Sequence, residues 1–185
     1  MFTILFKPVF HLAITTLLIF SCTSLVAATP GKREYNIKIA FIYNFIKYTQ
    51  WPKHDQFEDR FYFCSSNAQV AKLASAFFKG KHMNNRVIEV KNITIEKLQG
   101  CHLLFVSKTE SNLWEAYLTN KHLPGILIIG ETPGFAHSSS QINFFLAANK
   151  IRFEINLKLL QKSSLTMHSQ LLRLAKIIKI SGASK

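Results

Sequence analysis

The sequence predicts an α/β fold, in which a single domain is built on a mixed β-sheet of about five to six strands flanked by helices. Along the chain the spacing of apolar residues alternates between the helical period of 3.6 and the strand period of 2, which is the pattern of a mixed α/β domain. Two short, continuous apolar runs, residues 102–106 and 125–130, are typical of central strands covered on both faces. No internal repeat or low-complexity tract interrupts this pattern.

An export signal is predicted for residues 1–28. Lys7 gives a positive start, residues 9–20 are almost wholly apolar, and Val26-Ala27-Ala28 supplies the small residues that signal peptidase reads. Polar residues break the apolar run, so a retained membrane anchor is disfavoured. We expect cleavage after Ala28, which leaves residues 29–185 as the domain; lipidation at Cys22 is the alternative.

The first predicted element of the domain is a helix over residues 34–50. Ile37, Phe41, Asn44 and Phe45 share one face of a helical wheel, but the other side is apolar too, so we expect burial on two sides. The helix is expected to end at Trp51-Pro52, because proline disfavours helical geometry in the residue before it. A strand over 61–64, a helix over 68–78 and strands over 86–93 and 102–106 follow.

The second half begins with a helix near residues 110–119 and a central strand over 125–130. A loop rich in turn residues, 131–140, leads to a predicted antiparallel hairpin of residues 141–146 and 151–155 around Asn149-Lys150, at one side of the sheet. The last segment, 163–180, is predicted to be helical, with Leu171, Leu174 and Ile178 on one face and Arg173 and Lys176 on the other.

The chain carries a strong positive charge. Its formal net charge is +13, and the predicted signal removes one lysine and no acid. Such a chain is attracted to anionic surfaces, and export argues against nucleic acid. The candidate anionic partners are phosphorylated outer-membrane lipid, a cell-wall polymer and an acidic protein domain. The alternative is that the basic surface serves solubility alone.

Two cysteines, Cys64 and Cys101, remain once Cys22 leaves with the signal. Because thiols are usually oxidised outside the cytoplasm, we expect a structural disulfide between them. It would close a loop of about 38 residues, for which the chain-entropy estimate is roughly 4 kcal/mol. A redox-active pair is the alternative, but the C-x-x-C spacing is absent.

The sequence shows no constellation typical of an enzyme or of a metal or cofactor site. The few acids are far apart, and the histidines (54, 82, 102, 122, 137 and 168) have no metal-ligand spacing. We therefore expect surface or hydrogen-bonded histidines, a solvated Ser138-Ser139-Ser140 loop, no cofactor and no catalysis.

Residues 40–52, AFIYNFIKYTQWP, resemble the opening motif of the YfiR-like family of exported bacterial proteins. Similar motifs follow in the family order at 61–64, 100–107, 134–136 with 142–144, 151–157 and 171–175, so the resemblance covers nearly the whole domain. It implies that Cys64 and Cys101 form the family's bridge. A second cysteine pair of some members is missing, since residues 137–140 stand in its place.

The resemblance further implies a periplasmic regulator. The best-known type of protein in this family binds the periplasmic sensing domain of a membrane diguanylate cyclase, and it represses cyclic-di-GMP signalling and biofilm formation. Repression ends when an outer-membrane peptidoglycan-binding lipoprotein sequesters the regulator. A sensor kinase is an alternative partner, and a homodimer is a further option. A periplasmic small-molecule binding protein is the alternative of another class, with an enzyme third.

The predicted partner surface is the hairpin and the C-terminal segment. Arg152 and Glu154 should share one strand face, and Leu160, Arg173 and Lys176 could extend the patch. An exposed apolar area rimmed by charge suits a transient protein partner. The alternative is that the apolar members of this set belong to the core.

Overall fold

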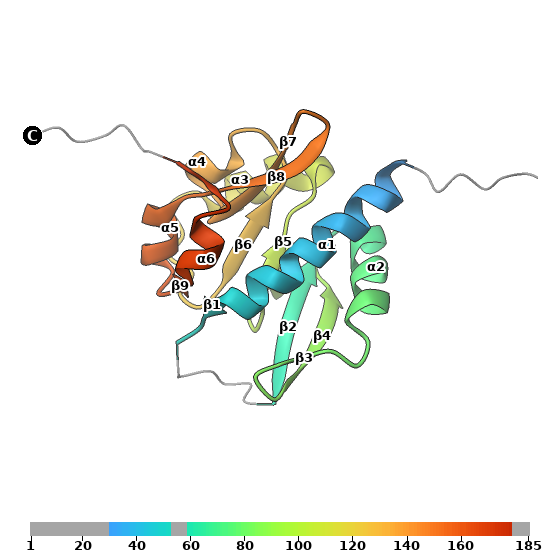
Figure 1. Ribbon diagram of the computed structural model, residues 1–185. Helices are drawn as coiled ribbons and strands as arrows, with labels where there is room; N and C mark the ends of the chain where they lie inside the picture. Colours follow the sequence, from blue (N-terminus) through green and yellow to red (C-terminus); the bar gives the residue numbers. More distant parts are fainter. Residues whose placement is uncertain (1–29, 53–58, 179–185) are drawn as a thin grey trace, which may run out of the picture.

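The computed structural model describes residues 30–52 and 59–178 (Figure 1). The export signal predicted for residues 1–28, the lipidation candidate Cys22 and the end of the predicted C-terminal helix lie outside the described residues, as does His54. No helix in the described part is long and apolar enough to cross a membrane.

The main sheet is mixed and has eight strands in the order β10-β8-β7-β6-β5-β2-β4-β3. Neighbouring strands from β7 to β4 are parallel, whereas β8 runs antiparallel to β7, and β3 to β4. The strands are β2 (Arg60–Ser65), β3 (His82–Met83), β4 (Arg86–Asn92), β5 (Leu103–Phe105), β6 (Leu127–Gly130), β7 (Ile142–Ala147), β8 (Lys150–Ile155) and β10 (Lys176–Ile177). The α/β class and the mixed sheet are confirmed; the number of strands is not, because β3 and β10 at the two edges are two-residue strands that apolar patterning does not reveal.

Six helices accompany this sheet in the described residues, and a separate two-stranded ladder pairs β1 (Thr49–Gln50) with β9 (Thr166–Met167). The helices are α1 (Pro30–Tyr48), α2 (Ala68–Phe78), α3 (Ser111–Leu118), α4 (Phe135–Ser138), α5 (Leu157–Lys162) and α6 (Ser169–Leu172), with 3₁₀ turns at Ile95–Lys97 and Lys108–Glu110. In Figure 1, α1 crosses in front of the sheet with α2 beside it, and α3 lies behind.

The core therefore has two parts, one on each face of the sheet. Along β2, Phe61 and Phe63 belong to the larger cluster with α1 and α2, while Tyr62 and Cys64 belong to the smaller cluster with Trp114 of α3. This alternation follows from the two-residue period of a strand. Burial of every residue of β5 and β6 confirms that both are central strands.

Helix α1 buries only part of the predicted face. Ile39, Ile42, Phe45 and Ile46 are buried, whereas Ile37 is 42% exposed. Asn44, expected on the buried face, is exposed, and its Nδ2 donates to the Ala40 carbonyl at 3.3 Å. The prediction was wrong for Ile37 and Asn44, whereas Phe45 of the predicted face and the isoleucines of the other side are buried as expected. A helix with apolar residues all round gives no periodicity from which to choose one face.

The C-terminal segment is not the single helix that was predicted. Asn156 caps the start of α5 by accepting from the Leu159 N–H at 3.0 Å, and Ser164 adopts a left-handed φ of 57°, after the helix has ended at Lys162. The chain then forms β9, the single turn α6 and β10. Pairing of β9 with β1 and of β10 with β8 satisfies backbone groups that the helix would have paired.

The hairpin of β7 and β8 is confirmed as an antiparallel pair. Its turn residues are Ala148 and Asn149, both with left-handed φ values of 47° and 58°, as a two-residue type I′ turn requires. The hairpin lies next to the β10 edge of the sheet.

Candidate functional site

The structure brings three of the five predicted partner residues to one face of the hairpin. Arg152 and Glu154 share a strand face, and Lys176 of β10 donates to Glu154 Oε2 at 3.1 Å. Glu154 is buried, while Arg152 is exposed. Leu160 packs in the larger core on the other side of the sheet, so it is not available to a partner in this fold. Arg173 is exposed in the turn after α6.

Two apolar side chains of the C-terminal segment are exposed near these cations. Leu174 is 73% exposed and Ile177 is 36% exposed. We define the C-terminal edge surface as Arg152, Arg173, Leu174, Lys176 and Ile177. It lies at one edge of the sheet, because β10 pairs with β8 at Glu154 and Ile155.

Polar side chains fill the carboxyl ends of the central parallel strands β2 and β5, where α/β proteins commonly bind ligands. Glu110 Oε2 accepts from the hydroxyls of Ser66 and Ser107, each at 2.9 Å. Trp114 Nε1 donates to Ser66 Oγ at 2.7 Å, and Asn67 Nδ2 donates to Ser107 Oγ at 3.2 Å. These groups bond to one another, so the network ties α2 and α3 to the strand ends.

A buried ion pair joins α1 to the end of β6. Lys38 bonds to Glu131, and the two side chains are only 7% and 5% exposed. Glu131 also accepts from the Tyr35 hydroxyl at 3.1 Å and from the Lys108 backbone N–H at 2.8 Å. Burial, and then the nearby charge of Glu131, raise the pKa of Tyr35 above its ordinary value.

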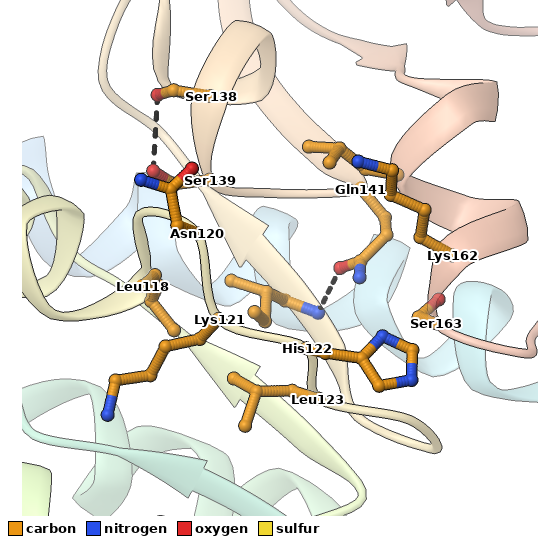
Figure 2. Close-up of a pocket in the computed structure, with 12 residues that line it drawn as sticks. Leu118, Asn120, Lys121, His122, Leu123, Ser138, Ser139, Gln141, Lys162 and Ser163 are labelled. Carbon is orange, nitrogen blue, oxygen red and sulfur yellow. Dashed lines mark hydrogen bonds between the residues drawn. The ribbon is translucent and has the colours of Figure 1, made fainter.

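A cavity of about 380 Å³ opens among α3, α4, α5 and the start of β6 (Figure 2). Its apolar lining comes from Leu118, Leu123, Ile128 and Leu159. Its polar lining comes from Asn120, Lys121, His122, Ser138, Ser139, Gln141, Lys162 and Ser163. Two of these side chains, Lys121 and Lys162, are cationic, and no carboxylate is among the described residues of the lining. The cavity is thus basic and partly apolar.

The Cys64–Cys101 disulfide is present, with the two Cα atoms 6.0 Å apart. It links β2 to the segment just before β5, and both cysteines are buried in the smaller core cluster. The expected bridge therefore connects two adjacent central strands.

Among the described residues no group of three or more His, Cys, Asp or Glu side chains could hold a metal ion. His102 is a core residue: its Nδ1 accepts from the Tyr62 N–H at 2.9 Å and its ring stacks on Phe61 at 4.9 Å. His82, His122, His137 and His168 are exposed, so their surface positions match the expectation.

Sequence reasoning missed the cavity and the buried Lys38–Glu131 pair. The cavity residues come from three stretches, 118–123, 138–141 and 159–163, and from Ile128 of β6, and none of these has a spacing that indicates a site. Only the fold brings them together. One sequence signal could have drawn attention to these residues: Lys162 ends one helix and Lys121 follows the end of another. Lysines are also common at helix ends for structural reasons, because they interact favourably with the helix dipole.

Comparison with known families matches residues 35–176 to a family described as YfiR/HmsC-like. The matched range contains both cysteines of the disulfide, the Lys38–Glu131 pair and every cavity residue. No curated protein matches the chain.

Proposed function

Because this chain belongs to the YfiR/HmsC-like family, we propose that it is a periplasmic regulator that binds the sensing domain of a membrane diguanylate cyclase and represses cyclic-di-GMP signalling. The observation that carries the proposal is the family match over residues 35–176. The matched range covers the same part of the chain as the motifs that resemble the family. The disulfide supports the proposal, because Cys64 and Cys101 are the residues that resemble the family's bridge.

The compartment is part of the proposal. Residues 1–28 direct export and are removed, residues 29–185 form the mature protein, and lipidation at Cys22 is the alternative. The disulfide supports an oxidising compartment, since cytoplasmic thiols are usually kept reduced.

The mechanism is occlusion without chemistry. Docking need only favour the inactive arrangement of the cyclase domain, because a ligand shifts an equilibrium by its differential affinity for the two states. A competing partner, such as an outer-membrane peptidoglycan-binding lipoprotein, would relieve repression by taking the same surface. A homodimer of this chain is compatible with the same scheme.

The C-terminal edge surface is the docking surface that we propose. Leu174 and Ile177 supply exposed apolar area at the β10 edge of the sheet, and the exposed Arg152, Arg173 and Lys176 add positive charge at the same edge. An apolar centre with a polar rim is the usual composition of a protein interface. The rim fits a partner domain with an acidic surface, because complementary charge speeds association and disfavours wrong partners.

The test is the intracellular cyclic-di-GMP level in the native host after deletion of the gene and complementation with variants. The docking variant is Leu174→Asp with Arg152→Glu, which spares the buried Glu154. The matched control is Leu113→Asp, because Leu113 of α3 is 62% exposed and lies on a helix behind the sheet. Equal amounts of folded protein in the periplasm are verified for every strain.

We expect deletion to raise cyclic-di-GMP, wild type and Leu113→Asp to lower it again, and the docking variant to fail. Loss of a well-packed apolar anchor costs about 2 kcal/mol of binding free energy, or roughly thirtyfold in affinity. An unchanged level after deletion would contradict the cyclase proposal and favour a sensor kinase partner. Full repression by the docking variant would contradict the proposed surface alone.

A further inference from the structure

We propose that the cavity among α3, α4 and α5 is a binding site for a small amphipathic organic acid, with its carboxylate held at the Lys162 end. This inference is independent of the proposed docking surface. The cavity volume of about 380 Å³ lies within the range of small-molecule sites. Figure 2 shows Lys162, Gln141, His122 and Ser163 on one side, with Ser138, Ser139 and Asn120 on the other.

The orientation of Gln141 gives the first argument for an anion. Its side chain is about 95% buried, and its Oε1 accepts from the Ile128 N–H at 2.7 Å. That bond fixes the amide, so Nε2 is the atom left for other partners. Nε2 has a long contact of 3.5 Å to the Ile126 carbonyl, and an NH₂ group carries two hydrogens. A hydrogen-bond donor is therefore available in the cavity wall.

Lys162 adds positive charge on the same side as this amide. Lys162 and His122 line the cavity there. Lys121 also lines the cavity, but its ammonium group stands 3.8 Å from the centre of the Tyr117 ring and points away from Gln141. Lys162 is thus the cation that we assign to the carboxylate, with charge-assisted hydrogen bonds as the attraction.

The carbonyl groups at the helix ends do not oppose an anion here. The last turns of α3 and α5 end at this cavity, and unpaired carbonyls would repel a negative charge. Their oxygens are occupied by the backbone: Leu118 accepts from the Lys121 N–H at 3.0 Å, and Leu159 and Leu160 accept from the Ser163 N–H, each at 3.1 Å. These three carbonyls are therefore hydrogen-bonded within the chain and do not present free oxygens to a ligand.

The remaining lining explains why the acid should be amphipathic. Leu118 and Ile128 are buried, and Leu123 and Leu159 are half-buried, so together they form an apolar wall. Covering apolar surface stabilises a complex through the hydrophobic effect. On the other side, Ser138 donates to Glu115 at 2.6 Å, which places a carboxylate beyond the serines. The carboxylate of the ligand is therefore expected away from the serines, at the Lys162 side.

The test is isothermal titration calorimetry of the mature protein with 3-phenylpropionate and octanoate. The corresponding alcohols, 3-phenyl-1-propanol and octanol, keep the apolar part and lose the charge, while inorganic phosphate keeps a charge and lacks the apolar part. Each probe is titrated into wild type, Lys162→Met and Lys158→Met. The last variant is the matched control, because Lys158 is an exposed lysine of the same helix that does not line the cavity.

We expect at least one of the two acids to saturate a single site in the wild type. Its alcohol and phosphate should bind about tenfold more weakly. In Lys162→Met the affinity for the acid should fall about tenfold, whereas in Lys158→Met it should not change. Amide chemical shifts should move at residues 118–123, 138–141 and 159–163. Failure of both acids to saturate, equal binding of acid and alcohol, equal binding of acid and phosphate, or equal effects of the two lysine substitutions would each overturn the proposal.

Discussion

Replacement of Lys38 by methionine should strongly destabilise the fold. Methionine retains most of the length of the lysine side chain but leaves the carboxylate of Glu131 without its cation, at 5% exposure. Breaking a buried ion pair from one side costs about 3–5 kcal/mol. Glu131 keeps the hydrogen bonds from the Tyr35 hydroxyl and the Lys108 N–H, so we expect the lower end, about 3 kcal/mol of unfolding free energy. For a domain of this size that lowers Tm by roughly 6–12 °C.

The assay is urea unfolding of wild type, Lys38→Met, Glu131→Gln and the double variant, which gives the coupling free energy of the pair. The exposed Arg60–Glu89 pair, with side chains 54% and 36% exposed, is the matched control, and such pairs couple by about 0.2–1 kcal/mol. If Lys38→Met costs no more than Arg60→Met, the reasoning about burial is refuted.

Three further predictions concern stability. Replacing Cys64 and Cys101 by alanine should lower the unfolding free energy by up to about 4 kcal/mol, measured by urea unfolding; equal stability of the variant and the wild type would contradict a structural bridge. Gly130→Ala should cost about 1–3 kcal/mol, because the added Cβ would lie 2.3 Å from Cδ1 of the buried Phe135; a thermal melt matching wild type would show that the ring can move. Burial raises the pKa of Tyr35, so the folded chain keeps a proton that the unfolded chain releases above its ordinary pKa near 10. Stability from this group is present below pH 10 and lost as the pH rises further; Tyr35→Phe should flatten that loss in the unfolding free energy, and an unaltered slope would contradict the assignment.

The elements that the sequence predicted well are those with a clear period or a local signal. The bounds of α2, Ala68–Phe78, were predicted without error, since Asn67 is a side-chain cap whose Oδ1 accepts from the N–H groups of Gln69 and Val70. The hairpin was predicted from alternation around a turn sequence. Its first strand is shifted by one residue and its second begins one residue earlier than predicted, because the turn is Ala148-Asn149 and not Asn149-Lys150. The expected disulfide followed from two cysteines in an oxidising compartment.

The elements that were missed depend on contacts between distant parts of the chain. Residues 163–180 have a helical pattern, but Thr166 and Met167 gain strand partners in Gln50 and Thr49, more than a hundred positions away. Lys38 can be buried because it forms an ion pair with Glu131 at the end of β6. No local sequence pattern indicates that a lysine will pair with an acid far away in the sequence. Of the predicted site, Arg152 and Lys176 lie at the surface, whereas Leu160 serves the core.

The glutamates in the described part of the chain are engaged within the fold. Every glutamate in the described part of the chain accepts a hydrogen bond or an ion pair from the protein itself: Glu34, Glu89, Glu96, Glu110, Glu115, Glu131 and Glu154. Their partners are hydroxyls, backbone groups and the cations Lys38, Arg60 and Lys176. The formal net charge of the chain is +13, and Arg152 and Arg173 of the C-terminal edge surface are exposed. Docking at the C-terminal edge surface should then slow markedly with ionic strength, since exposed charges are screened over about 8 Å at 0.15 M salt. Stopped-flow association with the cyclase domain across a salt series tests this; a rate independent of salt would mean that Arg152 and Arg173 do not steer the encounter.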